Sequence, residues 1–151
     1  MSKTNEKLNL YLVNLNVLYR KVQNYHWNVV GKGFFTIEEP RHIKDLNIDE
    51  DDNILLEDLT NLLSNNLFNE AGLKNNFKEI TEKIFSDIIT LKSRCNSVFI
   101  VGNDIFSTKV NQSKELDIFI ECLFSLHKKM IDVADRVVEV VYGLPYNRKL
   151  K

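Results

Sequence analysis

Apolar residues recur at alternating steps of three and four over the first 29 residues, which is the spacing of one helical face. One histidine shares this face with aliphatic and aromatic side chains: Leu8, Leu12, Leu15, Tyr19, Val22, His26 and Val29. At about 1.5 Å per residue, a helix over 4–29 would be roughly 40 Å long. The pattern predicts a long amphipathic helix that turns the imidazole of His26 toward a buried surface.

A second apolar stripe follows the same segment. It consists of Leu10, Val13 and Val17. Two stripes give the helix more apolar surface than one intramolecular contact requires. The segment therefore also predicts a subunit interface, and with it a homo-oligomer.

Three further segments have helical periodicity. The second helix is predicted to begin at Thr36, where Thr36 and Glu39 fit a capping box, and to be interrupted over 40–53 before its apolar pattern resumes to residue 63. The third is predicted from Phe77 to a stop near Gly102. The fourth is predicted from an N-cap at Ser113 to a stop at 143–145, with His127 a core or edge residue on its apolar face.

Composition favours a few long elements in one domain. The chain has 151 residues, 44% of them hydrophobic, and only five glycines and two prolines to make turns. Four helices with one apolar face each pack most simply as an antiparallel bundle. The sequence thus predicts an all-α fold, a single domain over 1–151 with an interrupted second helix.

Charge and cysteine content exclude several classes of protein. A formal net charge of −1 argues against a generally cationic surface that binds nucleic acid. No apolar run approaches the roughly 18 residues that span a bilayer, so a soluble cytoplasmic protein without a membrane partner is expected. Cys95 and Cys122 are too few for a disulfide framework and fall on apolar faces. Neither a glycine-rich phosphate loop nor a nucleophile elbow is present.

Donor side chains after the first helix form a candidate metal site with His26. Glu38 and His42 are four residues apart, as are Asn53 and Glu57. In a helix, each pair would lie on one face, one turn apart. Two imidazoles and two carboxylates with an amide nearby suit iron, zinc or manganese.

At these residues the chain resembles the Dps family of mini-ferritins, the DNA-binding proteins of starved cells. The segment 25–29, the Gly31 and Gly33 turn and the segment 34–37 are similar to that family's signature, and 53–59 is similar to its second-helix motif. The resemblance covers about the first 63 residues. It implies a ferritin-like fold, a hollow dodecamer and a ferroxidase site shared between two subunits across a dyad.

The family holds its metal ligands at five positions, and this chain differs from the family at three of them. His26 and Glu57 match, whereas Glu38, His42 and Asn53 replace a histidine and two aspartates. The implied function is binding and oxidation of ferrous iron, for iron storage, detoxification and protection against oxidative stress. Loss of one acid favours one metal ion over two.

Each of these residues also has a purely structural interpretation. His26 can be a hydrogen-bonded core residue, Glu38 a first-turn acid favoured by the helix dipole, and Glu57 a solvated edge. Asn53 is interpreted as a helix-start or hydrogen-bonding residue, and the ring of Trp27, which the resemblance places beside the metal, as packing. The alternative function is a noncatalytic shell that has lost its metal centre.

Basic residues near both ends of the chain suggest a third possibility, a DNA-compacting protein. They are Lys3, Lys7, Arg148, Lys149 and Lys151. They resemble the basic tails with which some mini-ferritins hold DNA, although a short basic terminus is usually only solubilising. DNA is therefore an additional candidate partner.

Overall fold

The computed structural model describes residues 37–103 and 113–150. The expected first helix over 4–29, with His26 and Trp27, lies outside the described residues, as do Lys3, Lys7 and Lys151. The chain divides into two compact units. One unit is 39–133, and the described part of the other consists of 37–38 and 134–150.

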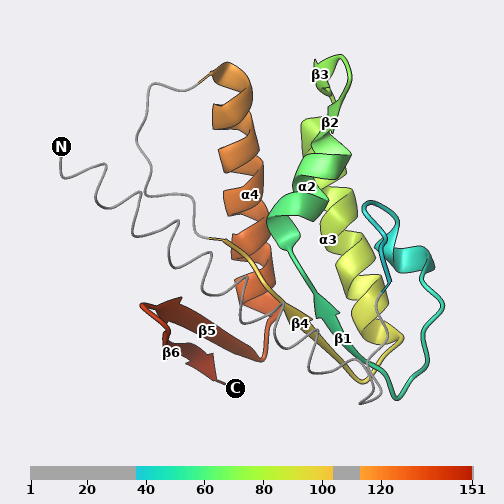
Figure 1. Ribbon diagram of the computed structural model, residues 1–151, viewed down its shortest axis with the longest axis vertical. Coiled ribbons are helices and arrows are strands. Elements are labelled where there is room, and N and C mark those ends of the chain that lie inside the picture. Colours follow the sequence, from blue (N-terminus) through green and yellow to red (C-terminus); the bar gives the residue numbers. More distant parts are fainter. Residues whose placement is uncertain (1–36, 104–112, 151) are drawn as a thin grey trace. The chain divides into compact units, whose positions relative to one another are not determined.

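The larger unit alternates short strands with helices (Figure 1). A 3-10 turn, η1 (Ile43–Asp45), precedes strand β1 (Asn53–Leu56) and helix α2 (Leu59–Leu67). A small hairpin of β2 (Phe68–Asn69) and β3 (Gly72–Leu73) leads to α3 (Phe77–Ser93), β4 (Ser97–Ile100) and α4 (Lys114–Val133). None of the helices in the described ranges is long and apolar enough to cross a bilayer.

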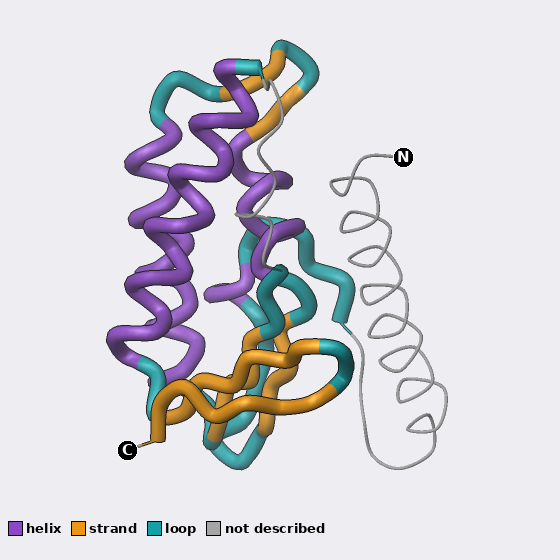
Figure 2. The backbone as a smooth tube through the Cα atoms, turned by 90° about the vertical axis from the view of Figure 1, so that its left-hand side faces the viewer, coloured by secondary structure: helices purple, strands orange, loops and turns teal. Residues whose placement is uncertain are grey.

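The three helices pack on one another and enclose the core of this unit (Figure 2). Leucines that are completely buried come from all three of them, at Leu63 in α2, Leu91 in α3 and Leu123 in α4. Burial of one such side chain stabilises the fold by about 1.5–3 kcal/mol. The buried apolar residues are Ile43, Leu59, Leu62, Leu63, Leu67, Ile84, Ile88, Leu91, Phe119, Cys122, Leu123 and Leu126.

Strands β1 and β4 form a parallel pair, with Asn53 opposite Ser97 and Leu56 opposite Ile100. Parallel neighbours need a long crossover connection, which α2, the small hairpin and α3 provide here. The pairing continues beyond the last strand residues, since Val101 N donates to Leu56 O at 3.1 Å and Leu59 N donates to Val101 O at 2.9 Å. The start of α2 is thereby tied to the carboxyl end of β4.

The prediction of an all-α four-helix bundle is wrong, because the described chain is mixed α/β. Helix α3 begins at Phe77 as predicted, but it ends at Ser93, and the segment expected to continue it forms β4. Valine and isoleucine fit a pleated strand well, and a short apolar run does not distinguish strand from helix. The tertiary pairing with β1 decides the outcome.

The first part of the expected second helix is also wrong, whereas the part expected after the interruption overlaps α2 from Leu59 onward. Residues 37–42 form no helix, and the Glu39 carboxylate accepts hydrogen bonds from Arg41 N and His42 N, both at 2.8 Å. These amides hold the pKa of the Glu39 carboxyl below its ordinary value of 4.5, the amide of His42 having the larger effect. The Glu39 side chain therefore caps the turn formed by the residues that follow it, up to His42.

Helix α4 follows Ser113 as predicted, but its buried face and its end differ. The buried side chains are Phe119, Cys122, Leu123 and Leu126, whereas Leu116 of the expected face is 39% exposed. Leu123 and Met130 also belong to the expected face, and Leu123 is completely buried while Met130 packs against the core. The expected face therefore packs in part, and Phe119, Cys122 and Leu126 beside it complete the buried surface. The helix ends at Val133, and a hairpin follows where its last turns were expected.

That hairpin belongs to the smaller unit and pairs β5 (Arg136–Val141) with β6 (Leu144–Leu150). Its two turn residues, Tyr142 and Gly143, have φ angles of 51° and 81°. Positive φ at both positions is what a two-residue hairpin turn requires, and glycine adopts it without strain. Gly143 was expected to end a helix and instead reverses a strand.

Candidate functional site

The carboxyl ends of β1 and β4 meet at one edge of the parallel pair. Glu57 and Asp58 follow β1, and Val101, Gly102 and Asn103 follow β4. In open α/β sheets, ligands bind at the carboxyl ends of the strands. Asn103 Nδ2 lies 3.4 Å from Asp58 Oδ2, which links the two loops.

Asp58 is the N-cap of α2. Its Oδ1 accepts a hydrogen bond from Asn61 N at 2.6 Å, and its carbonyl oxygen accepts one from Leu62 N at 3.1 Å. The amide of Leu59 is engaged by Val101 O. The bond from Leu62 N is the first intrahelical hydrogen bond, whereas the amides of Leu59 and Asn61 are first-turn donors of the kind that cradle a phosphate at a helix N-terminus. Two of these donors are therefore already satisfied within the protein.

The Oδ2 atom of Asp58 has weaker contacts than Oδ1. The amide nitrogens of Asn61 and Asn103 lie 3.3 and 3.4 Å from it. These distances are beyond the usual range of a strong hydrogen bond. The outer side of this carboxylate can therefore take an additional ligand.

Helix α4 brings an imidazole to the carboxyl end of β4. A Cβ placed on Gly102 would lie 2.7 Å from His127 Nε2 and 3.0 Å from His127 Cε1. Any side chain at position 102 would therefore collide with the ring of His127. Glycine at this position leaves the space that the imidazole occupies.

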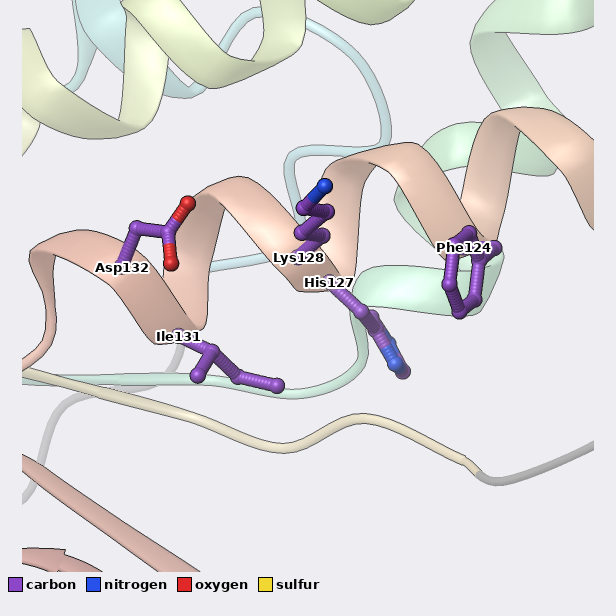
Figure 3. Close-up of a pocket in the computed structure, with 5 residues that line it drawn as sticks. All are labelled: Phe124, His127, Lys128, Ile131 and Asp132. Atoms are coloured by element: carbon purple, nitrogen blue, oxygen red, sulfur yellow. The ribbon is translucent and has the colours of Figure 1, made fainter.

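A pocket of about 340 Å³ opens on the same face of α4. Its lining residues are Phe124, His127, Lys128, Ile131 and Asp132 (Figure 3). Figure 3 shows the side chains of Phe124, His127 and Ile131 on one side of the helix. The pocket therefore combines two rings and an aliphatic wall with two charged groups at its rim.

The structure separates the metal-ligand pairs that the sequence suggested. No helix runs through Glu38 and His42, and both are exposed. Asn53 and Glu57 lie on and just after an extended strand, where four residues span about 13 Å rather than one helical turn. Asn53 Oδ1 instead accepts from Asn96 Nδ2 at 2.9 Å and from Ser97 Oγ, which joins the starts of β1 and β4.

Within residues 37–103 and 113–150, no group of three or more histidine, cysteine, aspartate or glutamate side chains can hold a metal ion. The helical spacing on which the metal site was predicted is absent there, since 38–42 are irregular and 53–56 are a strand. Metal binding that includes His26 stays a prediction.

Comparison with known protein families gives a match over residues 18–147 to the family described as cobinamide kinase / cobinamide phosphate guanyltransferase, CobU. The chain belongs to the CobU family. The match includes both strands of the parallel pair and all three helices described here. A search of curated proteins finds no significant match.

Membership of the CobU family corrects three expectations from the sequence. The resemblance to mini-ferritins over the first 63 residues is wrong as an assignment, since the CobU match extends over most of the chain. An iron-storing or ferroxidase function, with the noncatalytic shell and DNA-compacting alternatives built on it, is wrong for the same reason. The expected cofactor, iron with zinc or manganese as alternatives, is also wrong. The family is described by kinase and guanyltransferase activities, and the described residues contain no iron site.

Sequence reasoning missed the residues that the structure brings to the carboxyl edge. His127 was expected to be a core or edge residue, and Gly102 a helix stop. The signal for Gly102 was an apolar run, Val98 to Val101, that ends in glycine, as strands often do before a ligand-binding loop. No sequence signal joins position 102 to position 127, since only the packing of α4 brings them together.

Proposed function

We propose that this chain is a nucleotide-dependent transferase that acts on a cobinamide substrate. The observation that carries the proposal is the CobU family match over residues 18–147. The parallel β1–β4 pair supports it, because its carboxyl edge is the usual place for a nucleotide in an open α/β sheet. Nucleoside triphosphates are supplied in the cytoplasm, so the proposal places the reaction there.

The two activities in the family description make different bonds. The kinase step joins a hydroxyl oxygen of cobinamide to the γ-phosphorus of a nucleoside triphosphate and releases the nucleoside diphosphate. The guanylyl step joins a phosphate oxygen of cobinamide phosphate to the α-phosphorus of GTP and releases pyrophosphate. Both steps place negative charge on phosphoryl oxygens, which cationic groups stabilise.

Lys128 at the rim of the pocket supplies a cationic group beside His127. Magnesium normally accompanies such substrates and is held by one or two carboxylates together with phosphate oxygens. Glu57 and Asp58 provide carboxylates at the end of β1, and the weakly engaged Oδ2 of Asp58 fits this chemistry. We assign to Lys128 the role of contacting the phosphates. Glu57 and Asp58 would hold the magnesium ion, which would neutralise part of the phosphate charge.

One observation favours a second candidate, a family member that binds nucleotide without turning it over. The five glycines include no Gly-x4-Gly-Lys-Ser/Thr loop. Two first-turn amides of α2 that might replace such a loop, those of Leu59 and Asn61, are engaged by Val101 and Asp58. Nucleotide binding without product would support this candidate.

The test supplies the purified chain with Mg²⁺ and one pair of substrates at a time. Cobinamide with γ-labelled ATP or GTP tests the kinase step, and cobinamide phosphate with α-labelled GTP tests the guanylyl step. Label on the cobinamide product supports the transferase, and its absence with saturable nucleotide binding supports the noncatalytic member. Absence of both binding and product would overturn the proposal.

The matched variants are Lys128→Gln and Lys114→Gln, since both lysines are exposed on α4 but only Lys128 lines the pocket. We expect Lys128→Gln to lower turnover by about tenfold, equivalent to about 1.4 kcal/mol of transition-state stabilisation. Lys114→Gln should leave it unchanged. Self-association and DNA binding through the basic ends of the chain stay separate predictions.

A further inference from the structure

The hairpin of β5 and β6 (Figure 1) presents different side chains on its two faces. Residues directly opposite in an antiparallel pair share a face, and successive residues alternate between the faces. One face carries Glu139 opposite Tyr146. Arg148 Nη2 lies 2.5 Å from Glu139 Oε2, and its guanidinium lies 5.9 Å from the ring centre of Tyr146. This face has the ion pair and cation typical of a surface in contact with water.

The opposite face of the hairpin is apolar. Two of its members alternate along β5, and the other two lie opposite members of the same series on β6. We call it the valine face, and it consists of Val138, Val140, Pro145 and Leu150. Arg136 on the same side donates from Nε and Nη2 to Asn147 Oδ1 at 3.2 and 3.0 Å. The guanidinium beside the valine face is therefore engaged within the hairpin.

The valine face is open in the described structure. Val138 is 40% exposed, Val140 is 52% exposed and Leu150 is 65% exposed. Antiparallel sheets usually pack their apolar face and leave the polar face to water. A two-stranded hairpin alone is only marginally stable and needs a further layer against its apolar side. These exposures therefore indicate a docking surface for an apolar partner.

The connectivity of the chain favours a cover from its own first residues. The segment 1–36 lies outside the described residues and joins them at Ile37. Residues 37–38 belong to the same compact unit as the hairpin. The family match begins at residue 18 and ends at residue 147, so it includes part of this segment and most of the hairpin. The two ends of one domain often lie close together.

The sequence of the first segment suits the valine face in chemistry and length. Its longer apolar stripe, which the sequence places on one face of a helix over 4–29, includes Leu8, Leu12 and Leu15. Such a helix would be roughly 40 Å long, whereas a strand of six residues is about 20 Å long. An amphipathic helix packed on one face of a sheet is a common two-layer arrangement. One stripe therefore suffices to cover the hairpin along its length.

We propose that the valine face is a docking surface for residues 4–29 of the same chain, which pack their longer apolar stripe on Val138, Val140 and Leu150. The contact joins the first segment of the chain and its last hairpin in one two-layer element. It also gives the hairpin the apolar layer that two strands alone lack. The proposal does not depend on the nucleotide chemistry of the larger unit.

Hydrogen exchange of the full chain, followed by mass spectrometry, tests the proposal. Val138→Asp places a charge in the valine face, so the amides of residues 8–22 should exchange about tenfold faster. This is the lower end of the roughly 10- to 150-fold change that burial of one aliphatic side chain represents. Ile89→Asp is the matched control, because Ile89 is also 40% exposed but lies on α3. It should leave exchange over 8–22 unchanged.

The reciprocal variant changes the other side of the contact. Leu12→Asp should accelerate exchange of the β5 amides by a similar factor. The amides of 84–91 in α3 report whether the larger unit stays folded, and they should exchange at the same rate in every variant. If Val138→Asp also accelerates exchange in α3, Val138→Thr takes its place, since it keeps the shape of valine, and it should give a smaller acceleration over 8–22 alone.

Two results would overturn the proposal. One is unchanged exchange over 8–22 when the valine face carries the substitution and α3 stays protected. The other is exchange of β5 that slows as the protein concentration rises, with a mass above 17.6 kDa by light scattering that Val138→Asp returns to 17.6 kDa. The valine face would then contact a second copy of the chain instead of residues 4–29.

Discussion

Gly102 and His127 approach each other closely at the candidate site. A methyl group at position 102 would meet His127 Nε2 at 2.7 Å, so Gly102→Ala must displace the ring. Overpacking of this kind typically costs about 1–3 kcal/mol, and the lower end is expected because the colliding atom ends a rotatable side chain. Urea unfolding measures the loss.

The matched experiment repeats this substitution in a His127→Ala background. Removal of the ring frees the space, so Gly102→Ala should then cost little. The difference between the two backgrounds gives the interaction between positions 102 and 127. Equal losses in both backgrounds would contradict the steric explanation.

The two cysteines should differ in reactivity. Burial raises the pKa of the Cys122 thiol above its ordinary value of 9.0, and only 5% of the residue is exposed, whereas Cys95 is half-buried. Because the thiolate is the nucleophile, iodoacetamide at pH 8 should modify Cys95 first and Cys122 only after unfolding. Peptide mass spectrometry locates the label, and Cys95→Ser should abolish the early reaction.

The raised thiol pKa also sets the sign of a pH effect. The neutral thiol is the form that the fold favours, so its contribution to stability is complete below pH 9 and is lost as pH rises through the pKa of the folded state. Cys122→Ala should flatten the alkaline part of the stability profile. An unchanged profile would contradict the burial of an ionisable thiol.

Helix α2 depends on one cap. Asp58 accepts from Asn61 N at 2.6 Å, and replacing an N-cap of this type by alanine costs about 0.5–2 kcal/mol. We expect Asp58→Ala to lower the free energy of unfolding by this amount, and Asp58→Asn to retain most of it because the amide oxygen can still accept. Denaturant titration of both variants checks the prediction, and equal losses would contradict the cap.

The elements show which features the sequence determines locally. The starts of α3 at Phe77 and of α4 after Ser113 were predicted, since caps and apolar spacing are local signals. Their ends were not, because Val98 and Val137 lie in apolar runs that fit a helix or a strand. Val98 becomes part of a strand through a partner 44 residues away, Ile54, and Val137 through a hairpin with the strand that follows it. The same limit applies to the site, where Gly102 and His127 meet only through tertiary packing.

At the scale of the whole molecule, nucleotide binding should raise thermal stability. A ligand that binds only the folded state stabilises it by about 2.7 kcal/mol at 100 times its dissociation constant. For a chain of 151 residues, this corresponds to a rise in Tm of about 5–10 °C. Calorimetry with saturating GTP or ATP and Mg²⁺ measures the shift against sodium chloride at equal ionic strength, and an unchanged Tm would contradict the CobU-type function.

The parallel pairing joins Asn53 to Ser97 across 44 residues, whereas the helical contacts within α2 and α3 are local. Closing so long a segment costs entropy before the strand contacts repay it, so we expect this pair to form late on the folding route. Substitutions at the edge where Asp58, Gly102 and His127 meet should then accelerate unfolding more than they slow refolding. The part of the molecule best placed for chemistry would also be the part whose lifetime is most sensitive to mutation.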